Sequence, residues 1–295
     1  MNSFSRKFIT GMLLITLSSL VGGCMDFRAR FMANSMIPIM YKMDASTNKQ
    51  SDVELMRDAL PYTLVFLDGL IEASPDNTTF LLKGAEANTG YAFAFVEDQD
   101  PERAKKFYLK AKKYALRVLE WNEEFIEALD KPLDEFIPTL EEFDIDDVPA
   151  LYWTASSWLS WISQSLDNPQ AFVDLPKAEA IVKRILVLDE EYYFGMAHVM
   201  MGTFYAAPPK ILGGNPVKAK EHYDKAFEIS ESKFLVMHFM YAKFYAYQIQ
   251  DRELFVETLE NVINAPDDIL PEKVLANQVA KMKARALLED IDEYF

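Results

Sequence analysis

The sequence predicts an all-α fold built from short helices that pair into hairpins. From residue 51 onward, apolar residues recur every three or four positions, and no segment alternates between apolar and polar residues for long enough to form a strand. Proline and small polar residues separate the apolar runs, and such residues end one helix and cap the next. The 295 residues include only 10 glycines, which disfavours a β-sandwich or barrel with its many tight turns.

Residues 1–23 have the pattern of a secretory signal peptide. Two basic residues, Arg6 and Lys7, precede an apolar stretch over 8–21, and two glycines follow that stretch. A membrane-spanning helix needs about 20 apolar residues, so this stretch is too short to cross a bilayer comfortably. We therefore expect residues 1–23 to be removed during export.

The single cysteine, Cys24, follows this segment directly. Residues 20–24, Leu-Val-Gly-Gly-Cys, resemble the bacterial lipobox, whose cysteine is diacylated and becomes the mature N-terminus; the alternative is an ordinary signal peptide with a stray cysteine. Two acyl chains anchor a protein stably, because each buried CH₂ contributes about 0.8 kcal/mol. The sequence thus predicts a lipid anchor at Cys24. Met25 stands where a sorting aspartate would be, which favours the outer membrane over the inner.

Residues 24–50 are predicted to form a lipidated tether with a first short helix, and residues 51–295 a helical domain. Phe27 and Phe31 give the short helix an apolar face, which Pro38 interrupts. Ser51 begins an S-x-x-E capping box, so a helix should start there and run to residue 73 or so, with a kink or a break at Pro61.

The rest of the chain continues as helices apart from one acidic loop. The loop is predicted over 130–147; its Asp-Ile-Asp-Asp at 144–147 lacks the pattern of a calcium-binding loop, which favours a solvated loop. The predicted helices cover 78–96, 101–119, 121–129, 148–166, 174–188, 192–206, 216–231, 234–249, 252–264 and 271–292.

Several helices carry the packing signature of degenerate tetratricopeptide-like hairpins. In this signature a small residue lets two helix backbones approach, and an aromatic ring one turn away fills the gap. Gly202-x2-Tyr205 is followed by Ala219-x3-Tyr223-x2-Ala226, and weaker or earlier copies start at Ala104, Ala178 and Ala242. The signature predicts a compact bundle or short solenoid; the alternative is an unrelated helical bundle.

The segment around Gly213 resembles a known family. Residues 202–209 form a helix end with an aromatic residue and prolines, and a structural turn follows at Gly213, Gly214 and Asn215 before a Lys-Ala helix. This order is similar to that of the T-components of tripartite ATP-independent periplasmic (TRAP) transporters, envelope lipoproteins with cryptic tetratricopeptide repeats. The resemblance extends over most of the chain after Cys24.

The resemblance implies a lipid-anchored helical protein that faces the periplasm of a bacterial cell envelope. Its implied partner is the periplasmic solute-binding protein of a TRAP transporter, the P-component. The resemblance also implies a homotrimer with an apolar cleft in each protomer. A general envelope scaffold that binds a peptide or an assembly factor is the alternative function.

Helices near the predicted concave face carry rings and polar groups suited to an apolar or amphiphilic ligand. The alternative for each ring is an ordinary place in the core, because aromatic side chains dominate helical cores. The candidate ligand-binding residues are Asn88, Tyr91, Phe95, Trp153, Ser157, Trp161, Phe204, Tyr205, Tyr241 and Tyr245.

Composition and motifs argue against other functions. A net charge of −16 repels phosphate backbones, so no nucleic-acid partner is expected. The three histidines fall on three predicted helices and no paired cysteines occur, so neither a metal nor another cofactor is expected. No nucleophile elbow is present, and we find no catalytic constellation.

Overall fold

The computed structural model describes residues 27–208 and 213–295, and within them every regular element is a helix, which confirms the all-α prediction. Residues 27–35 are helical. The α-helices that follow are α2 (Ile37–Asn48), α3 (Val53–Ala73), α4 (Thr78–Phe95), α5 (Pro101–Val118), α6 (Glu123–Ala128), α7 (Leu133–Thr139), α8 (Val148–Ser163), α9 (Pro169–Leu188), α10 (Tyr192–Ala206), α11 (Pro216–Ile229), α12 (Leu235–Met240), α13 (Arg252–Asn264) and α14 (Val274–Glu289). Four short elements are 3-10 helices or a π-helix: η1 (Leu140–Glu142), η2 (Ile145–Asp147), the π-helix η4 (Tyr241–Ala246) and η5 (Ile291–Glu293).

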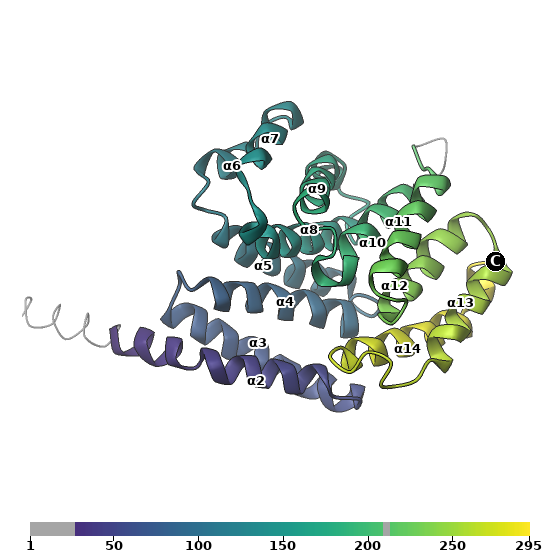
Figure 1. Cartoon of the computed structure of the whole chain (residues 1–295), viewed down its shortest axis with the longest axis horizontal. Helices are drawn as coiled ribbons and strands as arrows, with labels where there is room; N and C mark the ends of the chain where they lie inside the picture. The colour runs from purple at the N-terminus through teal and green to yellow at the C-terminus, as the bar shows by residue number, and fades with distance from the viewer. Residues whose placement is uncertain (1–26, 209–212) are drawn as a thin grey trace, which may run out of the picture.

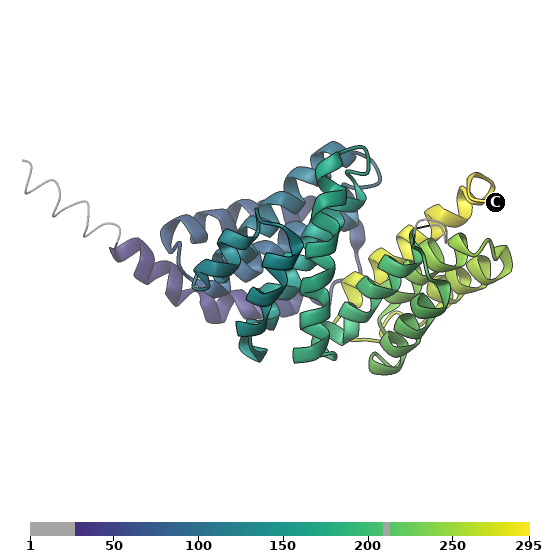
Figure 2. The same cartoon turned by 90° about the horizontal axis from the view of Figure 1, so that it is seen from above.

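Neighbouring helices in the chain pack against each other and build two halves (Figures 1 and 2). In the first half α4 packs on α3 and α5, and α8 packs between α5 and α9. In the second half α10 packs on α11, and α14 packs on α12 and α13. The last helix, α14, returns to contact α2 and α3, so the C-terminal half closes against the N-terminal helices.

Polar residues at the predicted breaks begin the helices. The side chains of Asn77, Asp100, Asn168, Asn215 and Asp251 each accept a hydrogen bond from a backbone N–H in the first turn of the following helix. Such caps satisfy N–H groups that have no partner within the helix. The helix starts predicted at residues 78, 101, 216 and 252 are therefore confirmed, whereas the helix capped by Asn168 begins earlier than predicted.

Some predicted boundaries are wrong. Asp52, rather than Ser51, caps α3 by accepting from the Leu55 N–H at 2.9 Å, and α3 runs through Pro61 without a break. The predicted 130–147 loop contains α7, η1 and η2, because acidic residues follow each helix start and Phe136 is fully buried. α9 begins five residues before the predicted 174, because Asn168 and Pro169 supply a cap and a first turn.

Two large cores meet along α10. The first gathers buried side chains from α4, α5, α8 and α9, and the second gathers those from α11 to α14. A buried ion pair closes the seam between the halves: Lys283 Nζ on α14 lies 3.1 Å from Glu97 Oε1 at the end of α4, and it also bonds Asp98. Both Lys283 and Glu97 are less than a tenth exposed.

Cys24 and the signal segment 1–23 lie outside the described residues. Within 27–208 and 213–295, no helix combines the length and the apolar character that crossing a membrane requires.

Candidate functional site

The packing signature makes the contacts that it predicts. Ala104, Tyr108 and Ala111 are fully buried on α5, which packs between α4 and α8. On α10, a Cβ added to Gly202 would lie 2.8 Å from the ring of Tyr223 on α11, so only glycine permits this approach. Assignment of these hairpins to tetratricopeptide repeats stays a prediction, because the contacts alone do not define a repeat.

The turn between α10 and α11 is fixed to the end of α10. Gly213 has φ +96°, a left-handed conformation that glycine adopts without strain. The Asn215 N–H donates to the Tyr205 carbonyl at 2.8 Å, and the Asn215 side chain accepts from the Lys218 N–H at 3.1 Å. The predicted turn therefore does two tasks: it reverses the chain and begins α11.

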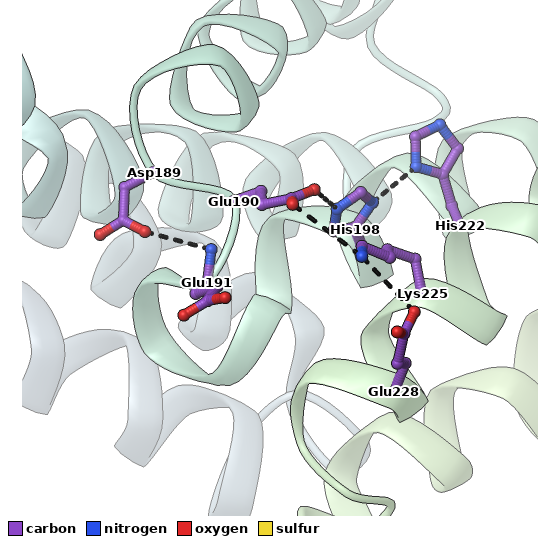
Figure 3. Close-up of polar contacts among 7 residues, drawn as sticks. All are labelled: Asp189, Glu190, Glu191, His198, His222, Lys225 and Glu228. Carbon is purple, nitrogen blue, oxygen red and sulfur yellow. Dashed lines mark hydrogen bonds and ion pairs between the residues drawn. The ribbon is translucent and has the colours of Figure 1, made fainter.

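Beside this turn, α10 and α11 bring two histidines into contact (Figure 3). His198 Nδ1 lies 3.0 Å from His222 Nδ1, and His198 Nε2 lies 3.2 Å from Glu190 Oε2. If the Nε2–H of His198 donates to the carboxylate, its Nδ1 is an acceptor and the Nδ1–H of His222 donates to it. Lys225 Nζ lies 3.9 Å from the other Glu190 oxygen.

The surroundings lower the pKa of both histidines. Burial, the neighbouring His198 and Lys218 lower the pKa of His222 to about 4. Burial also lowers the pKa of His198, although the hydrogen bond to Glu190 opposes that change. The ring of Tyr205 stacks on His222 with centroids 5.8 Å apart, so one predicted site residue borders the histidine pair.

The backbone at the start of α10 has an unusual left-handed conformation. Tyr193 (φ 49°), Phe194 (φ 62°) and Gly195 (φ 77°) are three consecutive left-handed residues. Bulky residues adopt this conformation at a cost of about 1–3 kcal/mol each, so the surroundings must hold them there. A Cβ on Gly195 would meet Ile229 at 3.0 Å, which ties this turn to α11.

Rings from both halves surround Tyr193. Its ring centroid lies 5.1 Å from that of Tyr152, 5.3 Å from that of Trp153 and 6.2 Å from that of Phe234. Lys273 Nζ lies 3.1 Å from the Tyr193 hydroxyl and 4.4 Å from its ring centroid. Burial lowers the pKa of Lys273, while Glu86 and Asp44 oppose that change. We call Tyr152, Trp153, Tyr193, Phe234 and Lys273 the junction cluster.

The ten predicted ligand-binding residues do not gather in one place. The aromatic ones on α4 and α8 belong to or pack against the first core, where Tyr91 lies 5.7 Å from Phe95 and Trp153 joins the junction cluster. Tyr241 and Tyr245 belong to the second core and stack on each other at 4.8 Å, on the π-helix η4. Rings less than a tenth exposed are Tyr91, Trp153, Trp161, Tyr241 and Tyr245.

One predicted ring reaches a surface hollow. Tyr245 lines a hollow of about 240 Å³ whose other walls come from α11. The walls are mixed in character, with Pro216 and Val217 apolar and Lys220 and Asp224 charged. Phe204 and Tyr205, at the end of α10, contact each other edge-on at 5.5 Å and are half-buried.

The two predicted polar groups differ in what they bond. The Ser157 hydroxyl donates to the Trp153 carbonyl at 2.6 Å within its own helix. The Asn88 amide donates to the Gly84 carbonyl at 2.7 Å, but its Oδ1 is buried and accepts from no group in the described structure. Buried acceptors normally accept a hydrogen bond, so Asn88 Oδ1 is free to accept one from water or a ligand.

Sequence reasoning missed the histidine pair and most of the junction cluster. A signal for the pair exists: His198 precedes the turn on α10 and His222 follows it on α11, so the hairpin brings them to one level. Tyr193 and Lys273 lie 80 positions apart and join only through tertiary packing. No group of three or more potential metal ligands occurs within the described parts of the chain.

Comparison with known proteins identifies the family. A profile of the TRAP transporter T-component family matches residues 49–295. A relative from Treponema pallidum (strain Nichols), described as an uncharacterized protein, is 21% identical over 266 residues and covers 84% of this chain and 81% of its own. The family is a class of transporter accessory components rather than of enzymes. The profile covers more than half of the sequence, so this chain belongs to the TRAP transporter T-component family.

Proposed function

We propose that this protein is the lipid-anchored accessory component of a TRAP transporter and that it binds the solute-binding P-component in the periplasm. The family match over 49–295 is the observation that carries the proposal. The proposal includes acylation at Cys24, a periplasmic orientation at the outer membrane and assembly as a homotrimer. A helical domain with no catalytic constellation in its sequence fits a protein that acts by binding.

The lipid anchor rests on the lipobox-like segment 20–24. Mass spectrometry of the N-terminal peptide from bacterial membranes tests it directly. We expect cleavage before Cys24 and a peptide that carries acyl chains, and we expect Cys24→Ser to release the protein from the membrane fraction. An unmodified Cys24, or an intact signal segment, would contradict the anchor.

The proposal also includes an apolar or amphiphilic ligand held by a subset of the ten residues predicted for it, because the ten do not gather in one place. Two observations support this part: Asn88 Oδ1 has no donor, and Tyr245 lines a surface hollow. Native mass spectrometry of the unanchored domain should detect a small molecule that copurifies. Asn88→Leu should reduce its occupancy, whereas Ser157→Ala should leave it unchanged, because Ser157 bonds only its own helix.

Affinity capture tests the partner. The Cys24→Ser mature domain is used as bait in an envelope extract, and bound proteins and extracted lipids are identified by mass spectrometry. Recovery of a periplasmic solute-binding protein supports the transporter role. Recovery of peptides or assembly factors, with no solute-binding protein and no small apolar ligand, would instead favour a general envelope scaffold.

A further inference from the structure

The first helical segment carries positive charge in a strongly acidic protein. The whole chain has 46 acidic and 30 basic residues, whereas the segment 27–49 has Arg28, Arg30, Lys42 and Lys49 against the single acid Asp44. Asp44 faces inward and bonds Lys83 on α4 at 2.8 Å. Arg28 and Lys42 form no ion pair with any residue that the structure describes. The outer side of this segment is therefore basic.

The same outer side is also apolar. Ala33 and Met40 are buried against α3 and α4, and Met36 and Ile37 pack partly against the same cluster, whereas other large apolar side chains of this segment are exposed. Phe27 is 70% exposed, Phe31 69%, and Ile39 57%. Single exposed apolar residues are ordinary, but six in one segment of about 20 residues form a surface that normally contacts something. The six are Phe27, Phe31, Met32, Ile39, Tyr41 and Met43; with Arg28 and Lys42 they make up the outer face.

We propose that the outer face of residues 27–48 lies on the membrane surface, with its rings among the acyl chains and its basic residues at anionic lipid headgroups. A helix with aromatic and aliphatic side chains on one face and Arg or Lys beside them is suited to the bilayer interface, where its apolar face enters by about 5–10 Å. This inference rests on the anchor proposed at Cys24.

The position of the anchor selects the membrane as the occupant. Cys24 lies three positions before Phe27, and three residues span at most about 11 Å even when fully extended. Acyl chains on Cys24 would therefore bring Phe27 and Phe31 to the bilayer. Figure 1 shows that this segment begins at one end of the molecule and that α2 continues along its outer edge.

Photo-crosslinking in living cells distinguishes the possible occupants. The full chain is expressed with p-benzoylphenylalanine in place of Phe31 and irradiated, and its adducts are identified by mass spectrometry. Phe172 on α9 is the matched control position, because it is also a phenylalanine and is 61% exposed. A second variant carries Arg28→Glu and Lys42→Glu together with the probe at residue 31.

We expect phospholipid adducts from position 31 and none from position 172, and a several-fold loss of the lipid adducts in the double charge variant. Adducts from position 31 to a second copy or to another protein, or no adducts at all, would overturn the proposal. The N-terminal peptide from the same cells reports acylation separately. Acylated protein without lipid adducts would refute only the proposed membrane contact of the outer face. Lipid adducts without acylation would refute only the proposed anchor at Cys24.

Discussion

The hairpins α4–α5 and α10–α11 share a sequence signature, but the tyrosine hydroxyl of the signature has different hydrogen-bond partners in each. In both, the signature Ala-x3-Tyr-x2-Ala lies on the second helix and its tyrosine, Tyr108 or Tyr223, is fully buried. The Tyr108 hydroxyl donates to the carboxylate of Glu97 at 2.5 Å, and Glu97 pairs with Lys283. The Tyr223 hydroxyl lies 2.8 Å from the Thr203 hydroxyl and donates to the Met240 carbonyl at 3.3 Å.

The signature therefore determines how the tyrosine ring packs but not which groups its hydroxyl bonds. In α10–α11 the hydroxyl of Tyr223 bonds only neutral partners, Thr203 and the Met240 carbonyl. In α4–α5 the hydroxyl of Tyr108 bonds Glu97, whose buried ion pair with Lys283 joins α14 to the first half. A buried charge that loses its partner costs far more than a lost neutral hydrogen bond. We therefore expect the same kind of substitution to have unequal effects in the two hairpins.

The largest effect is expected from Lys283→Met, because it leaves the buried carboxylate of Glu97 without its cationic partner. The free energy of unfolding should fall by about 3–5 kcal/mol. Lys281→Met is the matched control: Lys281 is equally buried, but its partner Asp267 is 72% exposed and water can solvate it. Urea unfolding monitored by circular dichroism measures both variants.

The double variant Lys283→Met with Glu97→Gln should recover part of the loss, since it removes the uncompensated charge. Equal effects of Lys283→Met and Lys281→Met would contradict the special role of the α4–α5 network.

The second effect compares the hydroxyls directly. Tyr108→Phe removes a donor to a charged group and should cost about 1.5–3 kcal/mol, whereas Tyr223→Phe should cost about 0.5–1.5 kcal/mol. Thermal unfolding of both variants gives the difference. A larger loss for Tyr223→Phe would mean that the neutral group, rather than the ion pair, dominates.

The third effect concerns the close approach of the helices. A Cβ at Gly202 would press on the ring of Tyr223, which is fully buried, so Gly202→Ala should cost about 1–3 kcal/mol. A Cβ at Gly84 would meet the ring of Tyr114 and the tip of Ile71, both 2.8–2.9 Å away. Tyr114 is only half-buried and can move, so the cost of Gly84→Ala should be smaller. Chemical denaturation ranks the two, and the reverse order would contradict the difference in rigidity.

The smallest effect is a dependence on pH, which the hairpin α10–α11 shows and α4–α5, which carries no histidine, does not share. Because folding lowers the pKa of His222 to about 4 from an unfolded value near 6.5, the unfolded chain binds more protons between these values. The stability from neutral His222 is full above pH 6.5 or so and is lost as the pH falls toward that folded value. After allowance for solvent screening, the loss is about 1–2 kcal/mol.

His222→Gln should flatten the change of melting temperature between these pH values. His238→Gln should flatten it less, because the ring of His238 stacks on Phe227 at 4.3 Å rather than on a second histidine. Identical pH profiles for the wild type and His222→Gln would refute the effect of the histidine pair.

Local patterns predicted the elements well wherever a cap or a packing signature marks them. Asn77, Asp100 and Asn215 mark helix starts in the sequence and begin helices in the structure. The segment 130–147 was harder, because its proline and acidic residues also suit the first turns of short helices such as α7. Short helices depend on burial, here of Phe136 and Leu140, which no local pattern reports.

The candidate site shows a sharper limit. The turn at Gly213 and Asn215 follows from residues next to each other in the chain, and so it was predictable. The left-handed turn at Tyr193 and its contact with Lys273 was not, since rings from both halves hold it in place. Sequence periodicity also cannot tell a ring in a core from a ring in a cleft, because both lie on the inner face of a helix.

The chain belongs to the TRAP transporter T-component family, and the complex proposed for it with a solute-binding protein can be measured. The most direct test is a calorimetric titration of the Cys24→Ser mature domain with the TRAP solute-binding protein from the same genome. We predict a saturable complex that also migrates as one species in sedimentation velocity. Absence of both heat and complex at about 100 μM protein, where even a Kd of 10 μM or so would be evident, would contradict this proposal.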